Sequence, residues 1–285
     1  MGVSGLKELG RPLAAPGMVD HFDLSAGRQM NEIAIRDRLV EKAQMLYYSP
    51  RQPIPFIGDQ WADSLWANGL LNDLATYPHA FVLACIMDRQ VRAEIAWFVP
   101  FRIAEKIGGF SMQELRSLSR AEVKQLMTEP EPLHRFVDKM TDHFWSAVQR
   151  IDHRYGGDAT RIWAGKPPSA EVVYRFLEFD GVGPKIASMA ANILAREFKV
   201  PFADYYSIDI SADVHVRRVF GRLSLCAPEA TVEQVIYKAR ALYPVFPGII
   251  DLPVWEIGRQ WCKPSEPVCA GCYMRDICPT ANGRR

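Results

Sequence analysis

The segment Phe176–Asn192 has the sequence FLEFDGVGPKIASMAAN and predicts two helices joined by a tight turn. We expect the first helix to begin near Ser169, a suitable N-cap residue, and to end before Gly181. Pro184 suits the start of the second helix, where a missing N–H leaves nothing unpaired. A Gly-Val-Gly turn can direct backbone N–H groups at an anion such as a DNA phosphate. Taken alone, the segment favours the alternative of an ordinary turn that needs glycine for its backbone angles.

Helix signals recur along the rest of the chain, whereas strand signals are scarce. Capping boxes are predicted at Ser111–Glu114, Ser119–Glu122 and Thr231–Gln234. The segment Met30–Tyr48 has helical apolar spacing, with one side formed by Ile33, Ile35, Leu39, Ala43 and Leu46. The sequence therefore predicts an all-α protein.

The composition gives few indications of a partner. The first residues contain no apolar core, so we expect no secretory signal. The longest wholly apolar run, Ala80–Met87, is too short to span a bilayer. We therefore expect a cytoplasmic protein without membrane contact, associated with the nucleoid if the source is prokaryotic. Because the net charge is only +1, any argument for nucleic-acid binding must come from the motifs.

Four of the six cysteines lie in one short segment, CKPSEPVCAGCYMRDIC. They are Cys262, Cys269, Cys272 and Cys278. In a reducing compartment, clustered cysteines indicate a metal site rather than disulfides. Four thiolates are a full ligand set for one [4Fe–4S] cluster. A four-cysteine zinc site is the alternative, but such sites usually contain two Cys-x-x-Cys pairs, and this segment has one. We expect Cys85 and Cys226 to be plain buried residues.

Three features follow one another in a definite order: the hairpin with Lys185, the segment Asp213-Val-His215, and the four cysteines. Together they resemble the helix-hairpin-helix DNA glycosylases, and specifically the iron–sulfur branch typified by endonuclease III. The resemblance runs from about Pro78 to Pro279. It implies a [4Fe–4S] cluster on the four cysteines and a double-stranded DNA partner with a damaged or mismatched base.

The resemblance also implies roles for individual residues. Lys185 matches the family's nucleophile and Asp213 its obligatory aspartate, while Gln90, with Arg89, matches the helix end that fills the gap left by an extruded base. The other DNA-binding residues implied are Gly181, Val182, Gly183 and His215. Taken singly, three of these features have plainer interpretations. Lys185 could be a solvated lysine and Asp213 a helix N-cap, while Arg89 and Gln90 could be a polar helix end. Asp209 is a rival to Asp213 for the aspartate role.

The resemblance therefore implies a base-excision-repair DNA glycosylase with associated AP lyase activity. A carboxylate stabilises positive charge on the sugar, and a neutral lysine amine forms a Schiff base from which β-elimination can nick the strand. We expect burial in a cleft to favour the neutral amine of Lys185, with Asp213 positioned to take its proton. The alternatives are a monofunctional mismatch or 8-oxoguanine glycosylase and a non-catalytic iron–sulfur DNA-binding protein.

The expected architecture is two helical domains with the active site in the cleft between them. Residues 72–198 would form a helical barrel that ends in the helix-hairpin-helix motif. Residues 1–71, an N-terminal extension, would join residues 199–285 in an iron–sulfur cluster domain. Trp61 and Trp66 in the extension would belong either to the core or to the lesion pocket. We expect a monomer.

Overall fold

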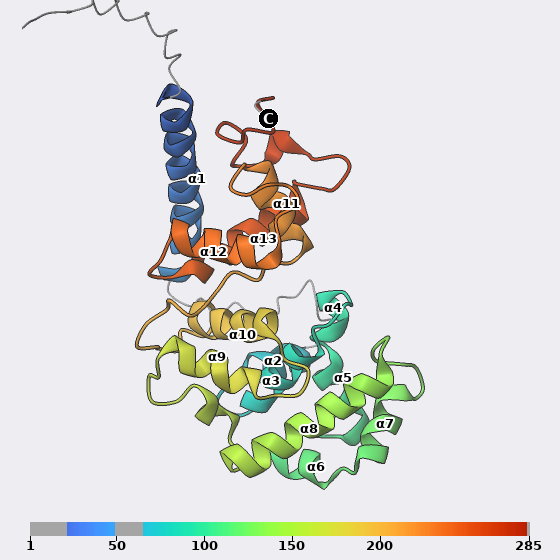
Figure 1. Cartoon of the computed structure of the whole chain (residues 1–285). Coiled ribbons are helices and arrows are strands. Elements are labelled where there is room, and N and C mark those ends of the chain that lie inside the picture. Colours follow the sequence, from blue (N-terminus) through green and yellow to red (C-terminus); the bar gives the residue numbers. More distant parts are fainter. Residues whose placement is uncertain (1–21, 49–64, 284–285) are drawn as a thin grey trace, which may run out of the picture.

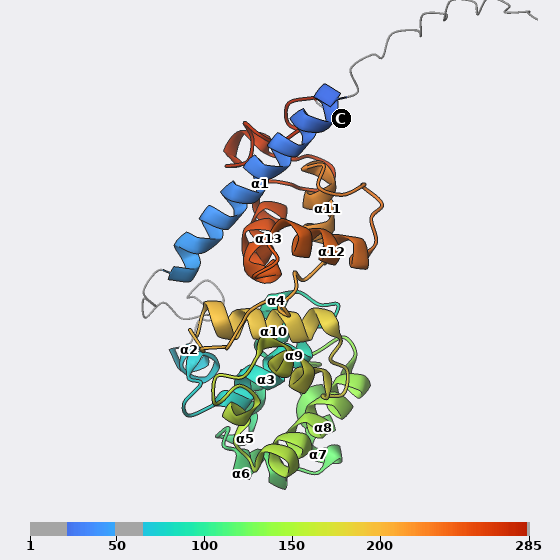
Figure 2. The same ribbon diagram turned by 60° about the vertical axis from the view of Figure 1, so that its left-hand side comes forward.

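The computed structural model describes residues 22–48 and 65–283, and these residues form helices without any strand. The predicted all-α class is confirmed. Trp61 lies outside the described residues, as does the side chain of Trp66. Figure 1 shows two helical bodies, one above the other, and the turned view in Figure 2 shows the same division.

The lower body in Figure 1 contains most of the helices. They are α2 (Leu65–Asn72), α3 (Pro78–Met87), α4 (Ala93–Ala96), α5 (Val99–Ile107), α6 (Met112–Ser117), α7 (Arg120–Thr128), α8 (Val137–Tyr155), the 3-10 helix η1 (Ala159–Ile162), α9 (Ser169–Leu177) and α10 (Pro184–Arg196). The upper body contains α1 (Phe22–Tyr48), α11 (Val214–Arg222), α12 (Val232–Leu242), α13 (Asp251–Gln260) and the 3-10 helices η2 (Pro247–Ile250) and η3 (Cys269–Gly271).

Helix α3 forms the centre of the lower body. Every residue from Pro78 to Met87 is buried, and the helix packs against α5, α8 and α10. The apolar run noticed in the sequence is therefore a core helix surrounded by other helices. None of the helices in the described part of the chain is long and apolar enough to cross a membrane.

Helices α9 and α10 form the predicted hairpin and pack closely on each other. Small buried residues on α10, among them Ala187, Ala190 and Ala191, allow the close approach. The expectation that Ser169 caps α9 is wrong, because Pro168 occupies the N-cap position. The Ser169 hydroxyl instead donates to Asp204 Oδ1 at 2.5 Å, 35 residues further along the chain.

Helix α1 packs on α13 and η2 in the upper body. Its inner side carries Ile35, Leu39 and Ala43, which are spaced by four residues and at most 2% exposed. Ile33, which we expected on this side, is 42% exposed because two residues along a helix turn the side chain to the opposite face. The Arg38 guanidinium donates to the backbone oxygen of Tyr273 at 3.1 Å, so α1 also holds the cysteine segment.

The three predicted capping boxes are present at Ser111–Glu114, Ser119–Glu122 and Thr231–Gln234. The predicted domain boundary at residue 72 stays a prediction; α2, which begins at Leu65, packs on α3 and α5 of the lower body. The bodies are joined by a buried hydrogen bond, in which Asn192 Nδ2 of α10 donates to the oxygen of Gly248 in η2 at 2.7 Å.

Candidate active site and cysteine loop

A pocket of about 960 Å³ lies where the two bodies meet. The lower body contributes the end of α3, α4 and the start of α10, and the upper body contributes the starts of α11 and α13. Lys185 comes from the lower side and Asp213 from the upper side. The structure therefore brings the two predicted catalytic residues to one pocket from different elements.

Lys185 is the second residue of α10, directly after Pro184. Its position in the first turn directs it at the pocket, and the residue is exposed. The expectation of a buried lysine is wrong, since the pocket is open to solvent at this point. Lys185 is thus both a solvated first-turn lysine and a residue of the pocket, so the two interpretations of it are compatible.

Asp213 is the N-cap of α11. Its Oδ1 accepts hydrogen bonds from the N–H groups of His215 at 2.8 Å and Val216 at 2.9 Å. The plainer interpretation as an N-cap is correct, and it is compatible with the pocket position. The rival Asp209 faces elsewhere, with its two carboxylate oxygens accepting hydrogen bonds from Arg240 at 2.7 and 2.8 Å.

Among the carboxyl groups that line this pocket, Asp88 and Asp251 were not predicted from the sequence. Desolvation raises the pKa of Asp88, against the attraction of Lys185, and the negative charge of Asp213 raises it further. Desolvation also raises the pKa of Asp251 to about 6, although the N–H of Ser211 donates to its Oδ1 at 2.7 Å. Asp88 directly precedes Arg89 and Gln90, which were matched to the family's helix end, and this is the one signal that could have pointed to it.

The segment Arg89–Gln90 follows α3 at the edge of the same pocket. Gln90 is exposed and has a φ of +51°, a left-handed backbone conformation that is uncommon for a residue with a side chain. Its carbonyl oxygen accepts a hydrogen bond from Arg135 at 3.4 Å. Arg89 Nη1 lies 3.5 Å from His143 Nε2. This strained, exposed turn is compatible with the predicted role at an extruded base, which stays a prediction.

The turn between α9 and α10 is closed by a hydrogen bond from the N–H of Val182 to the oxygen of Phe179 at 3.0 Å. The Val182 side chain is buried, so the turn is anchored in the core. Gly181 has a φ of +83°, and a Cβ there would lie 2.6 Å from His143 Nε2. The Val182 amide is thus engaged within the turn, and phosphate contact by Gly181, Val182 and Gly183 stays a prediction.

His215 also lines the pocket, from the first turn of α11. Its Nδ1 lies 3.0 Å from Arg218 Nη2, which also donates to the oxygen of Gly258 at 2.9 Å. A Cβ on Gly258 would lie 2.7 Å from the Cβ of His215, so α11 and α13 are in direct backbone contact here. The position of His215 is therefore fixed by packing.

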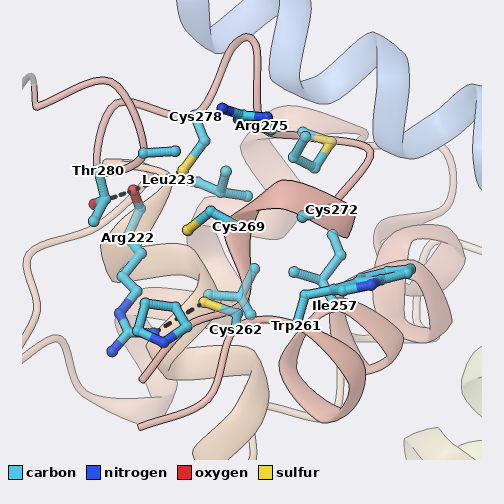
Figure 3. A pocket seen from close by; sticks show the side chains of 14 residues that line it. Arg222, Leu223, Ile257, Trp261, Cys262, Cys269, Cys272, Arg275, Cys278 and Thr280 are labelled. Carbon is cyan, nitrogen blue, oxygen red and sulfur yellow. Dashed lines mark hydrogen bonds between the residues drawn. The ribbon is translucent and has the colours of Figure 1, made fainter. Parts of the chain in front are cut away.

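The four clustered cysteines line a second pocket, in the upper body and next to the C-terminal loop (Figure 3). Apolar side chains including Leu223, Ile257 and Met274 form much of its wall. Burial raises the pKa of the Cys272 and Cys278 thiols. The Arg222 guanidinium donates to Cys262 Sγ at 3.3 Å, as the dashed line in Figure 3 marks.

Among residues 22–48 and 65–283, no group of three or more His, Cys, Asp or Glu side chains is close enough together to bind one metal ion. The four thiols are instead distributed around the pocket. The donor set itself, four sulfur ligands on an apolar pocket, fits an iron–sulfur cluster. The other two cysteines lie apart: Cys85 is buried as expected, whereas Cys226 is only partly buried.

The chain is similar in sequence to two named proteins, while no family model matches it. It is 30% identical to "Endonuclease III" of Thermotoga maritima over 215 residues, which are 73% of this chain and 85% of that protein. It is also 30% identical to "Endonuclease III-like protein 1" of Gallus gallus over 135 residues, 46% of this chain. The match spans only 41% of the length of the chicken protein.

The fold is similar to that of a trapped endonuclease III–DNA covalent intermediate. The TM-score is 0.58 at 17% sequence identity, and the superposition covers 89% of this chain and 98% of that one. The predicted resemblance is thereby confirmed: the chain belongs to the endonuclease III family, within the helix-hairpin-helix DNA glycosylases.

Proposed function

We propose that this protein is a base-excision-repair DNA glycosylase with AP lyase activity. The observation that carries the proposal is that Lys185 and Asp213, supplied by different helical bodies, line one pocket. Family membership supports the glycosylase activity. The lyase activity and the two residue roles are the finer part of the proposal. The partner would be a DNA duplex with a damaged or mismatched base, bound by a monomer in the cytoplasm or on the nucleoid.

In the proposed reaction, a neutral Lys185 amine attacks C1′ of a flipped-out nucleotide. The C1′–Nζ bond forms as the glycosidic bond breaks, and the base leaves with the bonding electron pair and takes up a proton. The Asp213 carboxylate faces the positive charge that develops on the sugar. Loss of a proton from Nζ and opening of the C1′–O4′ bond, with protonation of O4′, then give a protonated Schiff base from which β-elimination cleaves the strand.

The cofactor part of the proposal is a [4Fe–4S] cluster held by Cys262, Cys269, Cys272 and Cys278. The four thiols on one apolar pocket support it. When bound, the cluster would give the loop a fixed shape, because so short a segment has no core of its own. Arg275 within the loop is exposed and available to a phosphate.

A trapping experiment tests the proposal. Borohydride added during turnover of lesion-bearing duplexes should reduce the Schiff base and leave protein covalently joined to DNA. Lys185→Gln should abolish both the adduct and the nicking, because an amide cannot form an imine. Asp213→Asn should slow base release by about 10²-fold or more, but should affect nicking of a preformed abasic site less.

Three outcomes would contradict parts of the proposal. Base release by wild type without any adduct would indicate a monofunctional enzyme in which Lys185 is structural. An adduct formed by Lys185→Gln at the wild-type rate would indicate another amine as the nucleophile. Tight duplex binding with no base release over a panel of single defined lesions would indicate a non-catalytic DNA-binding protein. The same panel would identify the base that is removed.

A further inference from the structure

Helix α8 contacts the turn between α9 and α10 along one of its faces. His143, Ser146 and Arg150 are spaced by three and four residues, so they lie on the same side of the helix. Ser146 Oγ donates to Asp180 Oδ2 at 2.5 Å, and Arg150 Nη1 lies 3.9 Å from Glu178 Oε1. The residues that lead into the turn are therefore held by α8.

His143 continues this row of contacts to the turn itself. A Cβ on Gly181 would lie 2.6 Å from His143 Nε2, 2.7 Å from Cδ2 and 2.9 Å from Cε1. With three ring atoms this close to the position of a Cβ, the imidazole packs directly on the glycine backbone. Gly181 therefore serves two purposes: it adopts the φ of +83°, and it leaves room for the imidazole.

His143 also contacts the Arg89–Gln90 turn, which follows α3. Its Nε2 lies 3.5 Å from Arg89 Nη1. A guanidinium can only donate, so a hydrogen bond here needs an imidazole whose Nε2 accepts and whose Nδ1 carries the proton. Burial lowers the pKa of the His143 imidazole, and the positive charge of Arg89 lowers it further, which favours this neutral form. One imidazole thus lies against both turns.

The residue before the N-cap of α8 holds the Arg89–Gln90 turn from a second point. Arg135 Nη1 donates to the oxygen of Gln90 at 3.4 Å. The Arg135 guanidinium also lies 4.6 Å from the ring centroid of Phe136, the N-cap residue of α8. Gln90 has a φ of +51°, a strained conformation that persists only where its surroundings hold it. The α8 segment therefore contacts both of the turns that the resemblance matched to DNA contact.

Resting on the function proposed above and on the predicted role of Gln90, we infer that His143 is a positioning residue for nucleotide extrusion. It would set the spacing between the Arg89–Gln90 turn and the Gly181–Gly183 turn. Both turns would act on one duplex, the first by filling the gap left by the extruded nucleotide and the second by holding a phosphate. Because duplex DNA resists deformation, the two contacts can form together only if the spacing of the turns is fixed. His143 takes part in no bond change.

The test measures extrusion and base release separately, on the full-length protein. A fluorescent base analogue placed beside the lesion reports unstacking, and single-turnover assays at saturating protein give the rate of base release. His143→Ala should slow base release about tenfold and reduce the fluorescence increase, because a misplaced turn extrudes fewer nucleotides. Binding to a lesion-free duplex should be unchanged. His143→Gln, whose amide oxygen can accept from Arg89, should recover part of the loss.

His153→Ala is the matched control, because His153 is an exposed histidine in the last turn of the same helix. It should change neither the fluorescence nor the rate. Arg89→Ala should also slow base release. Adding His143→Ala to Arg89→Ala should cause a smaller further loss than His143→Ala causes in wild type, because the two residues share one contact.

Wild-type fluorescence and rate in His143→Ala would overturn the inference, even if that variant were less stable to unfolding. Fully additive effects of His143→Ala and Arg89→Ala would overturn it as well. Slower base release with a normal fluorescence increase would count against it, because His143 would then act after extrusion. A wild-type protein that extrudes the nucleotide but never releases a base would refute the proposed function instead, and the fluorescence comparison would still test the positioning role. A wild-type protein that does neither would refute both.

Discussion

The turn Gly181–Gly183 and the loop Cys262–Cys278 both lie next to helices, but they are held in place differently. Val182 in the turn is buried, and its amide closes the turn on Phe179. In the loop, Met274 is the one fully buried residue between positions 263 and 278. The chain's own packing shapes the turn, whereas the loop buries little of itself, and the cluster proposed for its four thiols would add to the contacts that hold it. The two regions should therefore respond to different perturbations.

The largest expected effect is on the loop. Cys272→Ser should abolish the iron content and the broad absorption at ~400 nm that the proposed cluster predicts, and should weaken DNA binding, because the loop would then lack that cluster. Metal analysis and absorption spectra of the purified protein measure this. Cys226→Ser is the control, since Cys226 lies apart from the pocket, and it should change neither property. Colourless wild-type protein with one equivalent of zinc would refute the cluster.

The turn should be broken by a backbone change that leaves the loop intact. Gly181→Ala should cost about 2 kcal/mol of unfolding free energy, because alanine is strained at a φ of +83° and its Cβ would lie 2.6 Å from His143 Nε2. At Gly183 the φ is −107° and a Cβ would meet nothing within 4 Å, so Gly183→Ala is the matched control. Urea unfolding monitored by circular dichroism compares the two. Equal costs would argue against the special geometry of Gly181.

These contrasts also show which parts of the molecule a sequence can predict. The capping boxes and the Gly181–Gly183 turn are local patterns, and the structure contains the helices that they predict. The four cysteines line one pocket, while the cluster expected on them stays a prediction. Asp88 and Asp251 were not predicted as site residues, because only tertiary packing brings the end of α3 and the start of α13 to one pocket. The exposure of Lys185 was missed for the same reason.

A smaller effect on stability is expected from a change at Asp251, which lies in the pocket between the two bodies and outside the cysteine loop. Its pKa is raised to about 6, so the folded protein binds this proton more tightly than the unfolded chain does. The resulting penalty is absent well below the unfolded pKa of 3.8, grows as the pH rises towards the folded pKa of about 6, and is complete above about pH 7. Asp251→Asn keeps an acceptor for the Ser211 N–H and should therefore be more stable than wild type by about 2 kcal/mol at pH 8, with little difference at pH 4.

Urea unfolding of wild type and Asp251→Asn at the two pH values checks this expectation. A stability difference that does not change with pH would mean that desolvation does not raise the pKa of the Asp251 carboxyl group. Absorption spectra taken alongside would show whether the cysteine loop is unaffected, as the comparison of the two regions requires.

The smallest effect is expected at Asp209, and it sharpens the choice between the two aspartates. Its pair with Arg240 is partly exposed, with side-chain exposures of 42% for the arginine and 16% for the aspartate. Asp209→Asn should cost about 1 kcal/mol of stability and leave the rate of base release unchanged. Asp213→Asn, measured in parallel, should slow base release. A slow Asp209→Asn variant of normal stability would reverse the assignment.

The buried bond between Asn192 and Gly248 has a consequence for how defects in this protein would be diagnosed. A Cβ at Gly248 would lie 2.7 Å from the oxygen of Ile208 and 3.1 Å from Asn192 Nδ2. The contact between the two bodies therefore leaves no room for a side chain at this position. A substitution at this position would change the alignment of Lys185 with Asp213 without touching either residue. An activity assay would show a slower reaction in such a variant, although both catalytic side chains would be intact and only their relative position would have changed.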